Sequence, residues 1–257
     1  MDTNSNQARR VVIGITAHVD AGKTTLAEAM LYRTGRLRKL GRVDHGSAAM
    51  DSHLLERERG ITIFSSQAEL PIGDLEVTLL DTPGHVDFSA EMERTLSVLD
   101  YAILVISGAD GVQAHTRTLW RLLELYRIPT FLFVTKMDFG RCGRGQMMEH
   151  LRHELGEGCV DFTPADRERR MEQLATCRED ALEAYLDGGE VPDALVRQLV
   201  GRRLVFPCWF GSGLKLEGID EFLEGLARYV EPPAYPAAFS ARVFKISHDP
   251  QGKRLTH

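Results

Sequence analysis

The segment "AHVDAGKTT", residues 17–25, decides the fold of this chain. It lies between the apolar run Val11–Ile15 and a stretch beginning at Leu26 that has helical spacing. A loop that joins a strand to a helix directs backbone N–H groups and a helix N-terminus to one place, which favours an anion. The segment therefore predicts a phosphate loop. The alternative is an ordinary turn with a chance Gly-Lys-Thr, and Ala17 stands where the usual pattern has glycine.

Three residues of this loop have definable roles toward a phosphate. Gly22 lets the backbone approach a ligand closely because it has no side chain. Lys23 brings an ammonium group to the outer phosphates, and Thr24 offers a hydroxyl to Mg²⁺. All three roles are filled in this sequence.

The composition is that of a globular α/β protein. The chain has 257 residues, 43% of them hydrophobic, which is enough for one large domain or two small ones. The apolar runs are too short to span a bilayer and the polar start "MDTNSNQARR" is no signal peptide, so we expect a cytoplasmic protein without a membrane partner. The formal charge of −6 gives no global attraction to nucleic acid, and the four cysteines form no C-x-x-C pair.

Short apolar runs alternate with stretches of helical spacing. The runs predicted as strands are 11–16, 76–80, 101–107, 130–135 and 205–210. The stretches predicted as helices are 24–33, 87–99, 116–126 and 219–230. This alternation predicts a P-loop NTPase domain of three α/β/α layers with a mostly parallel sheet.

Two segments depart from the alternation. Residues 61–70 are expected to add an antiparallel edge strand that forms a hairpin with the next strand. Residues 36–60 carry many charges and predict a long loop, which is more often functional than idle. The basic residues Arg36, Arg38, Lys39 and Arg42 either contact RNA or are simply solvated.

The remaining sequence predicts a domain organisation. Residues 1–10 are expected to be a disordered tail and residues 11–231 one domain. An Arg- and Glu-rich helical insertion at about 140–203 has helices near 146–155 and 164–186. Residues 232–238, with "PPAYP", are typical of a linker. Residues 239–257 are expected to begin a truncated β-barrel domain, because "FSARVFKI" alternates like a first strand.

The segment "DTPGH", residues 81–85, follows a predicted strand at its carboxyl end, where ligands of open parallel sheets bind. Asp81 can hold a Mg²⁺-bound water, and the N–H of Gly84 can approach a terminal phosphate. His85 would stand beside that phosphate. Alone this motif is most often a turn, but some sixty residues after a phosphate loop it indicates a site.

The segment "TKMD", residues 135–138, ends another predicted strand. Asp138 favours guanine, because guanine presents two donors to a carboxylate and adenine does not. The stem of Lys136 could lie along the base. The later segment "GSGLK" could reach the base oxygen through backbone N–H groups of Ser212, Gly213 and Leu214.

The order of "AHVDAGKTT", "RGITI" (59–63), "DTPGH", "TKMD" and "GSGLK" resembles the GTP-binding domain of translational GTPases. The longer stretches "LLERERGITI" (54–63), "LSVLDYAILVISGADGVQAHTR" (96–117) and "VFKI" (243–246) are most similar to tetracycline-resistance ribosomal-protection proteins, which are relatives of elongation factor G. The resemblance covers residues 11–246 apart from the middle of the insertion.

The resemblance implies roles for particular residues. Lys23 and Thr24 would hold the β- and γ-phosphates and Mg²⁺. Thr62 would close over Mg²⁺ only with GTP bound, which makes residues 36–62 the first switch. His85 matches the catalytic histidine that the ribosome brings in to position the attacking water.

The remaining assignments also follow from the resemblance. Val19 and Ile61 match an apolar gate that keeps the histidine out, and Asp20 an acidic residue tied to that gate. Ala21 and Thr25 complete the implied nucleotide-binding loop. The implied cofactor is Mg²⁺, with GTP as substrate and GDP as product, in a monomeric domain that acts on the ribosome through a full-length parent and does not bind DNA.

Thr135 departs from the family pattern, which usually has Asn at this position. That Asn braces the phosphate loop and touches the base, and a threonine hydroxyl can make only part of these contacts. We therefore expect nucleotide binding weaker by on the order of 1 kcal/mol, with guanine selectivity kept by Asp138.

Several alternatives stay open at this point. An elongation factor G-like or release-factor-type GTPase would share the loops. A P-loop ATPase or small-molecule kinase would prefer ATP and would not use Asp138. A nucleotide-dependent binding module would bind GTP without turnover.

Overall fold

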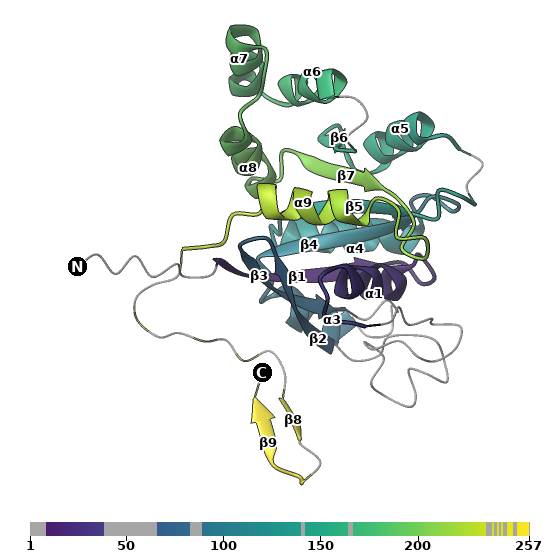
Figure 1. The fold of residues 1–257 in the computed structure, drawn as a ribbon, viewed down its shortest axis with the longest axis vertical. Helices are drawn as coiled ribbons and strands as arrows, with labels where there is room; N and C mark the ends of the chain where they lie inside the picture. The colour runs from purple at the N-terminus through teal and green to yellow at the C-terminus, as the bar shows by residue number, and fades with distance from the viewer. Residues whose placement is uncertain are drawn as a thin grey trace.

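The computed structural model describes residues 9–38, 66–82, 89–139, 142–163, 167–234, 238, 241, 243, 246–248 and 251–256 (Figure 1). Its centre is a sheet of seven strands in the order β2-β3-β1-β4-β5-β7-β6. Every pair in this sheet is parallel except β2 with β3, which is antiparallel. The predicted mostly parallel α/β fold is thereby confirmed. The predicted edge hairpin is present, but its first strand spans Ser66–Ile72 rather than 61–70, and residues 61–65 lie outside the described residues.

The strands of the sheet are short and mostly buried, as parallel strands covered on both faces must be. Their bounds are β1 Arg9–Ala17, β2 Ser66–Ile72, β3 Leu75–Asp81, β4 Tyr101–Ser107, β5 Thr130–Thr135, β6 Cys159–Asp161 and β7 Phe206–Phe210.

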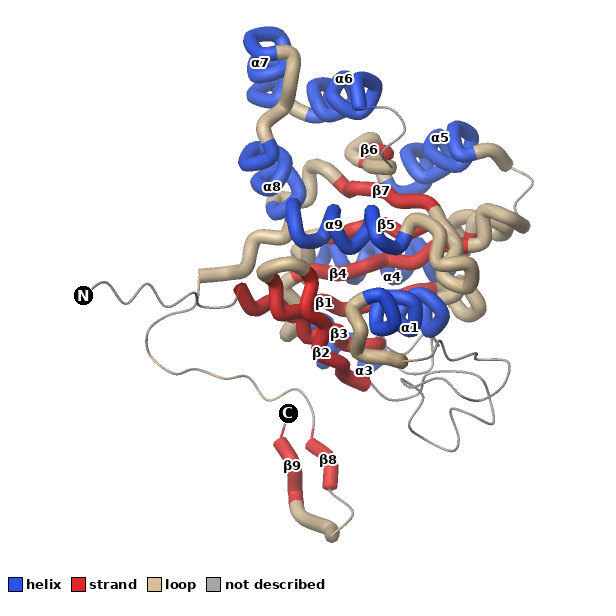
Figure 2. The backbone as a smooth tube through the Cα atoms, viewed as in Figure 1, coloured by secondary structure: helices blue, strands red, loops and turns tan. Residues whose placement is uncertain are grey.

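The helices connect or cover these strands (Figure 2). Their bounds are α1 Lys23–Arg33, α3 Ser89–Leu96, α4 Ala114–Leu125, α5 Arg144–Leu155, α6 Arg167–Cys177, α7 Glu179–Gly188, α8 Asp193–Gly201 and α9 Ile219–Tyr229. Among the described residues, no helix combines the length and apolar content that crossing a bilayer requires.

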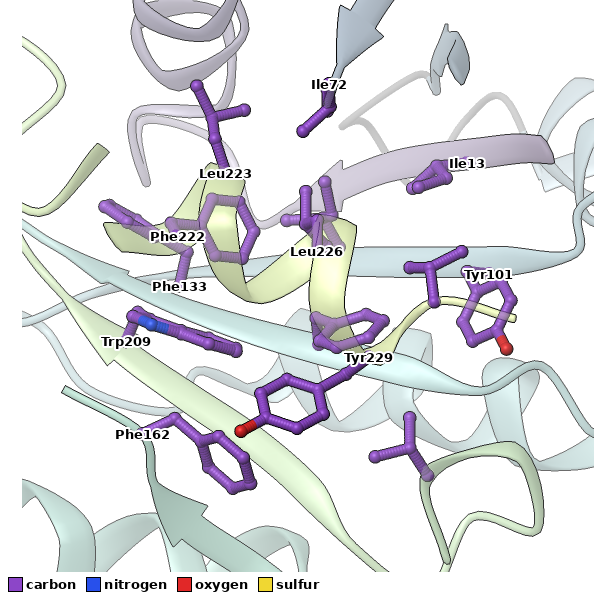
Figure 3. Packing of buried hydrophobic residues seen from close by; sticks show 14 of the residues in the cluster. Ile13, Ile72, Tyr101, Phe133, Phe162, Trp209, Phe222, Leu223, Leu226 and Tyr229 are labelled. Carbon is purple, nitrogen blue, oxygen red and sulfur yellow. The ribbon is translucent and has the colours of Figure 1, made fainter. Parts of the chain in front are cut away.

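Alternate residues of the strands feed two separate cores. On β4, Ile103 and Val105 join the core beneath α1 and α9, whereas Leu104 and Ile106 join the core beneath α3, α4 and α5. Figure 3 shows the first core, in which Phe133 of β5 packs on Phe222 of α9 with ring centroids 5.0 Å apart. The sheet therefore lies between two layers of helices, with one core on each of its faces, which gives the three α/β/α layers.

The register of the strands brings the predicted site segments to the same edge of the sheet. Ala17 at the end of β1 pairs with Val105, and Ser107 at the end of β4 pairs with Thr135 at the end of β5. Asp81, the last residue of β3, lies opposite Ile15. The carboxyl ends of β1, β3, β4 and β5 therefore meet at one edge of the sheet.

The insertion differs from its prediction as a purely helical segment. Three of its residues form β6, which pairs with β7 through Cys159 opposite Phe206 and so extends the sheet. The predicted helix at 164–186 is divided into α6 and α7 around Arg178, and residues 164–166 lie outside the described residues. The insertion is thus partly continuous with the domain core.

The N-terminal prediction is wrong for two residues. Arg9 and Arg10 belong to β1 rather than to the tail, because they pair with Leu75 and Glu76 of β3. Their side chains add ion pairs: Arg9 donates to both oxygens of Asp74 at 2.9 and 3.1 Å, and Arg10 donates to Glu76 at 3.1 Å. The rest of the predicted tail, residues 1–8, lies outside the described residues.

A two-stranded hairpin follows the domain. Its strands are β8 Ile246–His248 and β9 Arg254–Thr256, and they pair antiparallel. Of the predicted strand 239–246, most residues lie outside the described ones, and β8 begins only at its last residue. The linker at 232–238 and the β-barrel start at 239–257 stay predictions.

Candidate functional site

The loop between β1 and α1 has a backbone shape suited to an anion. Asp20 and Gly22 both have positive φ, at 61° and 91°, and Gly22 is the residue that caps α1. Gly22 has no side chain with which to cap the helix, and within the described residues no side-chain cap is formed at this N-terminus, whose first N–H groups are suited to an anion. The conformation at Gly22 is the one that favours glycine.

Lys23, the first residue of α1, is directed toward the end of β3. Its ammonium donates to Asp81 Oδ1 at 2.5 Å and to the carbonyl of Thr82. Both side chains of the ion pair are buried, with 8% of Lys23 and none of Asp81 exposed. The predicted phosphate-binding lysine and magnesium-binding carboxylate therefore meet at one point.

Thr82 fixes the chain just after this carboxylate. Its backbone N–H and its hydroxyl both donate to the carbonyl of Ile15, at 3.1 and 2.9 Å. The motif continues into Gly84 and His85, which lie outside the described residues, as do Thr62 and Ile61. Their predicted roles stay predictions.

Thr135 at the end of β5 supports the phosphate loop. Its hydroxyl lies 2.6 Å from the carbonyl of Ala21 and 3.2 Å from that of Ile106, and its one proton can serve one of them at a time. The side chain also lies beneath Gly22, where an added Cβ would sit 3.5 Å from Oγ1. The end of β5 and the phosphate loop are thus in direct contact.

Lys136 strengthens the same contact. It adopts a positive φ of 55° and its ammonium donates to the carbonyl of Asp20 at 2.6 Å. The stem of this side chain consequently spans from the end of β5 to the phosphate loop. This places an apolar surface next to the position predicted for a base.

Asp138 lies in the loop after β5 and pairs with Lys215 of the loop after β7. The lysine ammonium lies 2.8 Å from Asp138 Oδ2. This hydrogen bond lowers the pKa of Asp138 and raises the pKa of Lys215. The carboxylate is therefore held as an anion, which is the form that can accept from two guanine donors.

The loop after β7 closes the site from the other side. Ser212 and Glu217 exchange two backbone hydrogen bonds of 3.0 Å, which makes the loop tight. Gly213 lies against the backbone of Thr25, since a Cβ there would be 3.1 Å from the Thr25 carbonyl. Leu214 at the tip is half exposed. The base-side loop and the start of α1 are thus neighbours.

Two features of this region were not predicted from the sequence. Gly108, directly after β4, donates from its N–H to the Thr135 carbonyl at 2.7 Å, and a Cβ there would lie 2.8 Å from that oxygen. His18 and His115 lie with ring centroids 5.9 Å apart beside the phosphate loop. A glycine directly after an apolar strand is the signal that could have identified the first contact.

Comparison with known proteins agrees with this geometry. The family model for the elongation factor Tu GTP binding domain matches residues 8–232. The chain is 39% identical to an oxytetracycline resistance protein of Streptomyces rimosus and 34% identical to the tetracycline resistance protein TetO of Campylobacter jejuni, over 95% of this chain in each case. It covers 41% of each relative, so it spans about two fifths of their length.

A solved structure gives the same result. A crystal structure of a protein from Thermus thermophilus superposes with a TM-score of 0.85 at 28% identity, covering 97% of this chain and 45% of that one. The matched family model covers most of the chain and includes every site segment described above. The chain therefore belongs to the family of elongation factor Tu GTP-binding domains and is a GTPase domain of the translational kind.

Proposed function

We propose that this chain is the GTP-hydrolysing domain of a ribosome-dependent translational GTPase that releases tetracycline from the ribosome. The observation that carries the proposal is the meeting, at one edge of the sheet, of Lys23, Asp81, Thr135 and Asp138 with the loop 211–215. The groups that would bind phosphate and those that would read the base thereby lie at the same edge of the sheet, which supports the proposal.

The phosphate side supports phosphoryl transfer, which depends mainly on positioning and charge stabilisation. Lys23 would leave Asp81 to bind the β- and γ-phosphates when a nucleotide enters. Thr24 and Asp81 offer the hydroxyl and carboxylate oxygens that Mg²⁺ prefers, and they would hold the ion. Bound there, Mg²⁺ supplies neutralisation of the charge on the phosphate oxygens.

Thr62, Gly84 and His85 complete the proposed mechanism. Thr62 would close over the metal in the GTP state, Gly84 would donate its N–H to the terminal phosphate, and His85 would position the attacking water. The ribosome would supply the contact that brings His85 into place, so we expect slow hydrolysis without it. These residues and Val19 and Ile61 keep the roles that the family resemblance implies.

The base side supports selection of guanine. Asp138 would exchange its bond to Lys215 for the two donors of guanine, while Lys136 covers the base and residues 212–214 donate to the base oxygen. An adenine would leave the carboxylate without its partners, which costs about 1–3 kcal/mol or more for a charged group. We infer that GTP and GDP bind in preference to ATP.

The names of the relatives support tetracycline as the relevant drug, because they are oxytetracycline and tetracycline resistance proteins. The same site would serve an elongation factor G-like or release-factor-type protein. We propose a cytoplasmic location and a monomeric domain, with neither membrane nor DNA as a partner.

Two experiments test the proposal at different levels. Titration calorimetry of this chain with GDP, GTP and ATP in the presence of Mg²⁺ should give micromolar or tighter binding of the guanine nucleotides and none of ATP. Equal binding of ATP would overturn the assignment of Asp138 and favour an ATPase or kinase.

The second experiment measures turnover. The rate of phosphate release by the full-length protein should increase when ribosomes are added. Tetracycline should dissociate from drug-loaded ribosomes only when GTP is added. Stimulated GTP hydrolysis without drug release would favour the elongation or release-factor alternative. GTP binding without turnover on ribosomes would favour the binding module.

A further inference from the structure

A separate cavity lies in the insertion, between α5, β6 and α6, and is rich in arginine. It has a volume of about 350 Å³. Its charged lining residues are Arg144, Arg152, Arg169, Arg170 and Asp161. Among the described lining residues four positive charges thus face one negative charge, which favours an anionic ligand.

Asp161, the carboxylate among the described lining residues, is already engaged. Asp161 Oδ2 accepts from Arg144 Nε at 2.5 Å, and Asp161 Oδ1 accepts from the backbone N–H of Thr163 at 2.9 Å. It therefore offsets Arg144, and the buried donors of Arg152 and Arg170 lie outside this pairing.

Two arginines hold buried donors without an acceptor. Arg152 donates from Nε to the Cys159 carbonyl at 3.1 Å, but its Nη2 is buried with no partner among the described residues. Arg170 stacks over the ring of Phe162 at 5.5 Å, and its Nε is likewise buried and unpartnered in the described part of the chain. Leaving a charged donor buried and unpaired is costly, so each of these two atoms favours the presence of an acceptor.

Gln173, by contrast, requires a hydrogen-bond donor. Its Oε1 is buried and has no donor among the described residues. Gln173 and Arg152 line both this cavity and an adjoining one of about 400 Å³. A ligand that satisfies all three side chains must therefore carry an anionic oxygen group and a nearby donor such as a hydroxyl.

We propose that this cavity binds the phosphate group of a ribose phosphate. The phosphate oxygens accept from Arg152 and Arg170, whose guanidinium groups match phosphate in shape and charge. A sugar hydroxyl donates to Gln173. The volume suits a small ligand rather than a lone ion. A free sugar phosphate and the backbone of an RNA strand present this same chemistry.

Calorimetry on the chain saturated with GDP and Mg²⁺ tests the proposal, since the phosphate loop is then occupied. Ribose 5-phosphate should bind at one site per chain and ribose should not bind. Arg170→Met should weaken the binding by about tenfold, as expected for loss of a charged hydrogen bond. The matched control Arg202→Met removes an exposed arginine of the same insertion outside this cavity and should change nothing.

Asp161→Asn provides a test that a folding defect cannot imitate. The amide can still accept from Thr163, but it releases Arg144 and removes the negative charge, so ribose 5-phosphate should bind several-fold more tightly. Equal affinity in the original chain and in both variants would overturn the proposal, as would no binding of either ribose 5-phosphate or a short single-stranded RNA. If the RNA binds more tightly than ribose 5-phosphate and responds in the same way to both variants, the ligand is an RNA backbone. If ribose 5-phosphate binds more tightly than the RNA, the ligand is a free sugar phosphate.

Discussion

The hydroxyl of Thr135 lies 2.6 Å from the carbonyl of Ala21, so the end of β5 holds the phosphate loop from beneath. The family resemblance described above leads us to expect Asn at this position, where an amide could contact both the loop and a base. Thr135 is therefore the position at which this site departs from that expected pattern.

Replacing Thr135 tests this bracing role. Thr135→Val removes the hydroxyl but keeps the shape, and we expect GDP affinity to fall and the free energy of unfolding to drop by about 1 kcal/mol. Thr135→Asn should raise GDP affinity by on the order of 1 kcal/mol. Calorimetry measures the affinity, and chemical denaturation measures the stability.

A matched control lies at the opposite end of the same strand. The hydroxyl of Thr130 donates to the carbonyl of Ile128 at 2.9 Å, also in a buried position. The same hydroxyl accepts from Arg203 at 2.9 Å, so Thr130→Val should lower stability by at least a similar amount without changing GDP affinity. If Thr135→Asn leaves GDP affinity unchanged, the account of this position is wrong.

The pair of Asp138 and Lys215 predicts a pH dependence. Its hydrogen bond lowers the pKa of Asp138 below the ordinary value of 3.8, so the carboxylate stays ionised as the pH falls toward that lowered pKa. Lys215→Met removes the main cause of the shift, and the pKa of Asp138 should move back up. The acid limit of GDP binding should then begin at a higher pH than in the original chain.

Carbon-13 NMR of the Asp138 carboxyl during an acid titration measures this change directly. Arg167→Met breaks an exposed ion pair to Glu190 elsewhere in the chain and serves as the control, with no effect on Asp138. An unaltered Asp138 titration in Lys215→Met would show that the ion pair is not formed in solution.

Variants of the buried Lys23–Asp81 pair distinguish its contribution to the free energy of unfolding from its contribution to GDP binding. Lys23→Met leaves the Asp81 carboxylate buried without its ammonium partner, so we expect a loss of about 3–5 kcal/mol in the free energy of unfolding together with loss of GDP binding. The double variant Lys23→Met with Asp81→Asn removes the buried negative charge as well. It should recover much of the stability but none of the binding.

Denaturation and GDP titration of both variants give the answer. Recovered GDP binding in the double variant would mean that Lys23 acts only through Asp81 and does not hold phosphate. Unrecovered stability would mean that the neutral amide cannot replace the carboxylate in its buried surroundings.

Gly225 on α9 tests the packing of the first core. A Cβ there would lie 2.2 Å from the indole of Trp209, which Figure 3 shows packed beneath α9. Gly225→Ala should lower the free energy of unfolding by about 1–3 kcal/mol through overpacking. Gly201→Ala, at the end of α8 where nothing lies within 4 Å, should instead be neutral or stabilising by about 0.4–1 kcal/mol. Equal effects in thermal denaturation would contradict this packing.

Local sequence pattern predicts the core strands well. β4 and β5 have the predicted bounds, because continuous apolar runs flanked by turn residues define buried parallel strands. β6 was not predicted, because three residues are too few for a pattern and its pairing with β7 joins positions far apart in the chain. The same reason explains Arg9 and Arg10, whose strand character depends on partners in the β2–β3 hairpin.

For the candidate site, too, the sequence predicts the individual residues better than the contacts between them. Lys23, Asp81 and Asp138 were predicted as site residues because each belongs to a short motif of neighbouring residues in the sequence. Their partners were not, because the contact of Asp138 with Lys215 depends on how the loops after β5 and β7 are brought together by the sheet. Short motifs thus identify the functional groups, and strand register decides which of them touch.

The division of the strands' side chains between two cores also separates the only two tryptophans of the chain. Trp120 packs edge-on against Phe206 at 4.6 Å in the core beneath α4, and Trp209 packs against Phe222 at 5.3 Å in the core beneath α9. Each layer of helices therefore carries its own intrinsic fluorophore. Single-tryptophan versions of the protein would report separately on the loosening of each side, without any attached dye.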